Sequence, residues 1–151
     1  MQTSNDHAVK VLNSLIETTL DSANGYKEAA DHADSPEYKS LFAERAQRRT
    51  DLARQLQQEV RSFGGEPEDD QSLLGKLHNK FVGVKDAMSP DDGDKAIINE
   101  VERGEDVIKA KYQAAARDED LPATVRTLVT TAYGSVKADH DQISQLKHQL
   151  N

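Results

Sequence analysis

Glu105 is the residue with the clearest potential for chemistry, because a carboxylate there interrupts an apolar helical stripe. In Asp94–Ala116 the side chains of one face recur at spacings of three and four residues, which is typical of an amphipathic helix that faces a core. A carboxylate buried on such a face needs a cation, a hydrogen-bond donor or a metal ion. The middle of this helix is therefore where we expect a polar layer. The apolar positions around Glu105 are Ile97, Val101, Ile108 and Tyr112.

Polar residues also interrupt the apolar stripes of two other expected helices at a similar depth. Arg45 suits Glu105 as a partner, since its planar guanidinium meets a carboxylate through two hydrogen bonds and keeps its charge. Removing one side of such a buried pair strands the other charge and typically costs about 3–5 kcal/mol. We therefore predict a structural polar layer of Arg45, Glu105 and His140, with Asp139, Arg49 or Tyr133 beside them.

A metal centre is the alternative interpretation of the same residues. A di-metal site in a helical bundle takes one Glu from each of two helices and a Glu-x-x-His pair from each of the other two, and its oxygen and imidazole ligands suit iron or manganese. The chain has Gln47 where the second helix would need His, and Lys137 where the fourth would need Glu. A reduced site would therefore have only Glu105 and His140, with water or Glu102 completing the coordination.

The elements that would position this layer are helices joined by clear breaks. Ser35-Pro36-Glu37 is a helix start signal and Gly64-Gly65 a stop signal. The expected helices cover about 6–32, 36–63, 72–88, 94–117 and 122–149. The first two and the last two would form hairpins, and 72–88 would be a shorter helix in the long crossover between them. The pattern predicts an all-α, ferritin-like four-helix bundle in one domain spanning 1–151.

The composition limits the classes of function. Of the 151 residues 36% are hydrophobic and 30% charged, and the net charge of -8 disfavours nucleic acid and anionic membranes as partners. No apolar run approaches the roughly 18 residues of a spanning helix. The chain has no Cys and no visible secretory signal, so we expect a cytoplasmic protein.

The remaining candidate sites have weaker support in the sequence. Arg45-Ala-Gln-Arg48-Arg49 is basic, but ion pairing within an acidic chain explains it better than a nucleic-acid site. The acidic stretches Glu66–Asp70 and Asp91–Asp94 are expected to be loops. Neither a phosphate-binding loop nor a nucleophile elbow is present. Solvent exposure is the expectation for four histidines near helix ends and linkers: His7, His32, His78 and His148.

Several short motifs follow one another in an order that resembles a known family. They include Gly25-Tyr26-Lys-Glu-Ala-Ala30, Phe63-Gly-Gly-Glu-Pro67, Gly104-Glu-Asp106 and Ala138-Asp-His-Asp141. Over roughly residues 8–150 the chain is similar to an uncharacterised bacterial family of four-helix bundles, a domain of unknown function grouped with the ferritin-like fold. The resemblance implies the fold and a bacterial origin, and it brings no activity or cofactor.

The function that these observations favour is that of a non-enzymatic, soluble bundle in a stress-related or scaffolding role, self-associating as a dimer and needing no cofactor. A metal-binding redox or storage protein holding iron or manganese at Glu105, His140 and Glu102 is the first alternative. The second is a partner-binding module that presents the crossover face. That face would consist of Leu77, Phe81, Val84 and Met88.

Overall fold

The computed structural model describes residues 2–69 and 93–150, without the side chains of residues 2–4. Within these ranges the chain forms long helices: α1 (Gln2–His32), α2 (Pro36–Ser62), α5 (Gly93–Ala116) and α6 (Ala123–Leu150). No described residue belongs to a strand. The predicted all-α fold is confirmed, whereas the helix expected at 72–88 lies outside the described residues.

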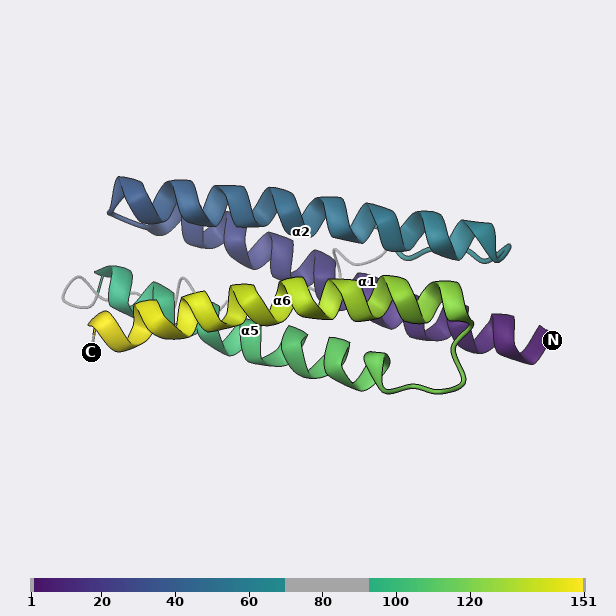
Figure 1. The fold of residues 1–151 in the computed structure, drawn as a ribbon. Coiled ribbons are helices and arrows are strands. Elements are labelled where there is room, and N and C mark those ends of the chain that lie inside the picture. The colour runs from purple at the N-terminus through teal and green to yellow at the C-terminus, as the bar shows by residue number, and fades with distance from the viewer. Residues whose placement is uncertain (1, 70–92, 151) are drawn as a thin grey trace.

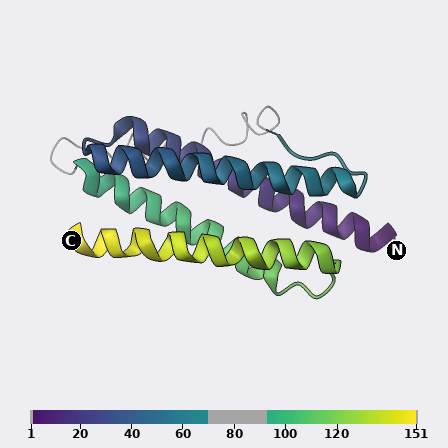
Figure 2. The same cartoon turned by 45° about the horizontal axis from the view of Figure 1, so that its top comes forward.

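The helices form two hairpins that lie along each other. In both Figure 1 and Figure 2, α1 runs beside α2 and α5 runs beside α6, and α1 also contacts α5. Asp94, in the first turn of α5, joins the two hairpins at one end. Its carboxylate accepts hydrogen bonds from the backbone N–H groups of Asp34 at 2.7 Å and Ser35 at 3.0 Å, in the turn between α1 and α2.

The predicted helix boundaries hold to within a few residues. α1 starts at Gln2 rather than at about residue 6, since neither Pro nor Gly interrupts the polar residues before Asp6. α2 starts with Pro36 at its first turn, as predicted, and Gly64, with a φ of 78°, takes the left-handed conformation after its end. The backbone N–H of Gly65 then bonds to the carbonyl of Val60.

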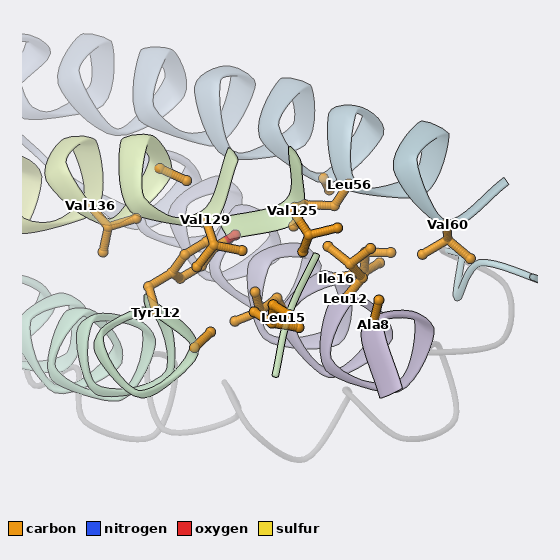
Figure 3. Packing of buried hydrophobic residues seen from close by; sticks show 14 of the residues in the cluster. Ala8, Leu12, Leu15, Ile16, Leu56, Val60, Tyr112, Val125, Val129 and Val136 are labelled. Atoms are coloured by element: carbon orange, nitrogen blue, oxygen red, sulfur yellow. The ribbon is translucent and has the colours of Figure 1, made fainter. Parts of the chain in front are cut away.

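The interior consists of two apolar clusters with a polar layer between them. In α1 the first cluster extends to Leu20 and the second begins at Tyr26. The other helices divide in the same way, with Arg49 in α2, Glu105 in α5 and Asp139 in α6 between their apolar segments. Figure 3 shows the first cluster, in which Ile16, Leu56 and Val125 point into the space between the helices. The fold therefore places the buried polar residues of the described helices at the same height along the bundle.

No described helix combines the length and apolar character that crossing a membrane would require.

Candidate functional site

Glu105 lies at the centre of the polar layer and is 1% exposed. Arg49 reaches it from α2 with both terminal nitrogens: Nη1 lies 2.9 Å from Oε1, and Nη2 lies 3.1 Å from Oε2. The hydroxyl of Tyr26, from α1, donates a second hydrogen bond to Oε1 at 2.7 Å. Both carboxylate oxygens are thus bound by protein donors on two different helices.

Asp139, on α6, is the second carboxylate of the layer and collects three arginines. Arg49 Nη2 lies 3.2 Å from its Oδ2, Arg48 Nη1 lies 3.2 Å from its Oδ1, and Arg45 Nε lies 3.6 Å from Oδ2. Arg45 is held further by Gln142, whose side-chain oxygen accepts from its Nη2 at 2.5 Å. Arg45 and Arg49 are each only 2% exposed, so these charges are compensated almost entirely by protein groups.

Tyr26 joins the two halves of the layer. Its hydroxyl accepts a long hydrogen bond from Arg45 at 3.4 Å while donating to Glu105. The guanidinium carbons of Arg45 and Arg49 lie 5.7 and 5.6 Å from the centre of its ring, within the range of cation–π attraction. We define the charge cluster as Tyr26, Arg45, Arg49, Glu105 and Asp139.

Burial and neighbouring charges shift the pKa values of two members of the charge cluster, Tyr26 and Arg49. Burial, reinforced by the negative charge of Glu105, raises the pKa of Tyr26 well above its usual value, so Tyr26 remains a neutral donor. Burial alone would lower the pKa of Arg49, but the negative charges around it, Glu105 foremost, and its hydrogen bond to Glu105 together outweigh burial and raise that pKa. Arg49 therefore stays charged and Tyr26 stays neutral near neutral pH.

The structure brings some of the predicted layer residues together and separates others. Arg45 and Asp139 belong to the charge cluster with Glu105, but it is Arg49 that pairs with Glu105, whereas Arg45 pairs with Asp139. Arg49 lies one helical turn after Arg45, about 6 Å further along the axis. The predicted partner of Glu105 is therefore one turn too early on α2, although Arg45 still belongs to the layer.

His140 and Tyr133 lie outside the charge cluster. His140 Nε2 lies 2.6 Å from Asp106 Oδ1 and its Nδ1 lies 3.2 Å from Asp141, both at the surface of the α5–α6 hairpin. Tyr133 packs against the first apolar cluster. The face of α6 that points into the bundle carries Val136, Asp139 and Ile143. His140 follows Asp139 directly, so it lies about 100° around the helix from Asp139 and points away from the centre.

Sequence reasoning did not assign Tyr26 and Ser22 to the layer. The ring of Tyr26 lies in the apolar interior, and its hydroxyl contributes a polar group from α1 to the layer. Ser22 accepts a hydrogen bond from Arg49 Nη1 at 2.7 Å. Its position one turn before Tyr26 on the same face is the signal that would have identified it.

The centre of the bundle does not fit a di-metal site. Two buried guanidinium groups occupy this level, and the oxygens of Glu105 are bound by Arg49 and Tyr26. The cavity beside Tyr26 and Glu105 measures only about 10 Å³, the space of at most one water molecule. The other predicted ligand, Glu102, bonds to Lys147 at 2.8 Å. The predicted ligands Glu105, His140 and Glu102 thus have separate protein partners.

A different group of ligand-type side chains lies at the end of the bundle near the start of α1. His7 Nε2 lies 2.7 Å from Asp118 Oδ2, and Asp120 lies beside them in the loop between α5 and α6. Partial burial acts to raise the pKa of Asp118, but the hydrogen bonds from His7 and from the backbone of Asp120, together with attraction to His7 and Arg126, outweigh it and lower that pKa. His7 is therefore paired rather than simply solvated. Within 2–69 and 93–150, this is the group of three His, Asp or Glu side chains close enough to hold one ion.

Two grooves between helices are further candidate sites. A groove of about 730 Å³ lies between α1 and α5, and one of about 280 Å³ lies between α2 and α6. The smaller groove exposes Arg48 and reaches Arg49 and Asp139, so it leads from the surface to the charge cluster. Neither groove holds a group of metal ligands among the residues described.

Comparison with known proteins gives a family and a fold. A family described as "Domain of unknown function (DUF2383)" matches residues 7–118. A solved structure of a Dps1 mutant from Mycobacterium smegmatis is similar to the chain at a TM-score of 0.80 and 10% identity, covering 97% of this chain and 99% of that one. No curated protein matches the sequence. The structural likeness, with the two hairpins described above, establishes the ferritin-like four-helix fold.

Proposed function

Because the chain belongs to the DUF2383 family, whose description names no function, we propose a role from its own structure: a non-enzymatic helical bundle with a charge cluster in place of a metal centre. The bundle would serve a stress-related or scaffolding role and associate with itself. The observation that carries this proposal is the position of Arg49, which holds both carboxylate oxygens of Glu105. A guanidinium fixed at that point occupies the position that a metal ion would need.

The charge cluster supports a structural role for the centre. Its partners come from all of the described helices: Tyr26 from α1, Arg45 and Arg49 from α2, Glu105 from α5 and Asp139 from α6. A buried ionic group of this kind fixes the register of helices, because any other alignment would leave a charge unpaired. On this proposal the residues of the centre specify the fold, and the scaffolding or stress-related role depends on the surface.

Iron(II) titration under anaerobic conditions tests the proposal at the bundle centre. The protein would carry His7→Gln, which removes the one imidazole of the group near the start of α1, and would be compared with the double variant His7→Gln/Glu105→Gln. We expect no iron binding that depends on Glu105, together with a lower melting temperature in the double variant. Binding near two equivalents of iron that Glu105→Gln abolishes would overturn the proposal and restore the iron or manganese alternative.

Self-association is tested separately by sedimentation velocity. The residues described expose only two large hydrophobic side chains, Val107 and Leu150, so a dimer formed by this surface would rest on polar contacts. Such contacts weaken as salt screens them. We expect a dimer whose dissociation increases with salt concentration. A monomer at every protein concentration and at low salt would remove the self-associating role. The face predicted for a partner at Leu77, Phe81, Val84 and Met88 lies outside the described residues.

A further inference from the structure

We propose that His7, Asp118 and Asp120 form a binding site for one divalent transition-metal ion, distinct from the charge cluster. His7 lies in the second turn of α1, and the two aspartates lie in the loop between α5, which ends at Ala116, and α6, which begins at Ala123. One ligand atom from each of the three side chains lies within 4.8 Å of the others.

The donor set indicates the class of ion. One imidazole nitrogen and two carboxylate oxygens suit first-row ions such as manganese, iron(II), cobalt(II) and zinc, whereas calcium and magnesium prefer oxygen ligands alone. Two carboxylates also supply the negative charge that a divalent cation needs. His7 and Asp118 are partly buried and Asp120 is exposed, so water can complete the coordination from the solvent side.

The three side chains need little movement to close around an ion. Ligand atoms lie about 2.0–2.2 Å from zinc, so neighbouring ligands of a tetrahedral ion lie about 3.3–3.6 Å apart. His7 Nε2 and Asp118 Oδ2 lie 2.7 Å apart in their hydrogen bond, so an ion replacing the shared proton would need them to separate by less than about 1 Å. Asp120 already has an oxygen within 4.8 Å of the ligand atoms of His7 and Asp118, and its side chain is exposed, so it has room to move toward them. The backbone N–H of Asp120 bonds to Asp118 Oδ1 at 2.9 Å, which holds the loop in a conformation that keeps the two aspartates together.

An ion at this site would connect parts of the chain that are far apart in sequence. His7 and Asp118 are separated by 111 positions and belong to different hairpins. Figure 1 shows the N-terminal end of α1 at the same end of the bundle as the loop between α5 and α6. Since the ligands are together only in the folded chain, binding would stabilise the fold and hold the two hairpins against each other at this end.

The competing explanation is that His7 and Asp118 form an ordinary hydrogen-bonded pair with no ion. Asp120 separates the two explanations, because Asp120→Asn leaves that pair intact and replaces a charged ligand with a neutral, weaker one. Glu119→Gln is the matched control: it removes the same charge from the adjacent, exposed position of the loop without removing a ligand. His7→Gln removes the nitrogen ligand and keeps a side chain that can donate a hydrogen bond to Asp118.

The experiment is a titration of the full chain, metal-free and without a histidine tag, with cobalt(II) and with zinc. Cobalt absorbance reports the ligand environment and calorimetry reports affinity. We expect one equivalent of either ion and a higher melting temperature in its presence. His7→Gln should abolish binding, Asp120→Asn should weaken it at least about tenfold, as loss of even an outer partner of a metal site does, and Glu119→Gln should leave it unchanged. Absence of binding, or binding that all three variants share, would overturn the proposal.

Discussion

Arg49 and Glu105 face each other across the middle of the bundle and bind through two parallel contacts, Nη1 to Oε1 at 2.9 Å and Nη2 to Oε2 at 3.1 Å. Arg49 is 2% exposed and Glu105 is 1% exposed. The pair joins one hairpin to the other, and each partner has a further donor or acceptor, Tyr26 for Glu105 and Ser22 for Arg49. Arg49 and Glu105 therefore form a buried ion pair whose members are also hydrogen-bonded to other side chains of the protein.

Asp139 and His140 are adjacent in sequence, and the structure predicts losses of stability of very different size for changing them. Asp139→Asn removes the charge that Arg45, Arg48 and Arg49 share, and we expect it to lower the free energy of unfolding by about 3–5 kcal/mol. His140→Gln changes a contact at the surface of the hairpin and should cost at most about 1 kcal/mol. Urea unfolding of both variants measures this difference. A larger loss for His140→Gln than for Asp139→Asn would place the polar layer at the wrong face of α6.

Alkaline titration tests the environment of the buried tyrosines. Burial and the Glu105 charge raise the pKa of Tyr26, and burial raises that of Tyr112, whose hydroxyl lies 2.6 Å from Thr19 Oγ1. Because their folded pKa values exceed the unfolded value of about 10, both residues stabilise the fold fully below that pH. This stabilisation is lost as the pH rises above it.

The measurement is tyrosinate absorbance recorded together with helical circular dichroism. We expect the tyrosinate absorbance of these two residues to appear only as the helices unfold. Tyr26→Phe and Tyr112→Phe should each reduce the absorbance change that accompanies unfolding. Ionisation of Tyr26 while the helices remain intact would contradict its burial against Glu105.

Much of this arrangement follows from the sequence, for identifiable reasons. Pro36, Gly64-Gly65 and the spacing of apolar residues predict the helices. Glu105 can be identified because it interrupts an apolar stripe. Which arginine meets Glu105 is a different matter, since Arg45 and Arg49 lie on the same face one turn apart. The choice depends on how far one hairpin is shifted along the bundle axis relative to the other. The spacing of residues within one helix gives no information about this shift.

The group at His7 could not be predicted for a similar reason. Its ligands come from the second turn of α1 and from a loop 111 positions later, and no local motif connects them. His7 taken alone is indistinguishable from an exposed histidine near a helix end. These three polar residues form a candidate site only because the fold places α1 next to the loop between α5 and α6.

Two glycines provide a matched test of packing at the start of the bundle. A Cβ at Gly65 would lie 2.8 Å from Val9 Cγ1 and 3.2 Å from Val60 Cγ1, so Gly65→Ala should cost about 1–3 kcal/mol. Gly134, inside α6, has nothing within 4 Å of that position, and Gly134→Ala should stabilise the protein by about 0.5–1 kcal/mol. Thermal unfolding of the two variants measures both effects. Equal effects would mean that Gly65 does not pack against α1.

The central claim, that a structural ion pair forms the bundle centre, is tested most directly by a double-mutant cycle on Arg49→Met and Glu105→Leu. Each single variant strands a buried charge and should cost about 3–5 kcal/mol, while the double variant should cost less than the sum by about 1.5–3 kcal/mol. Arg45→Met with Glu105→Leu is the control and should show weaker coupling, because Arg45 pairs with Asp139. Additive effects of Arg49→Met and Glu105→Leu would contradict the account.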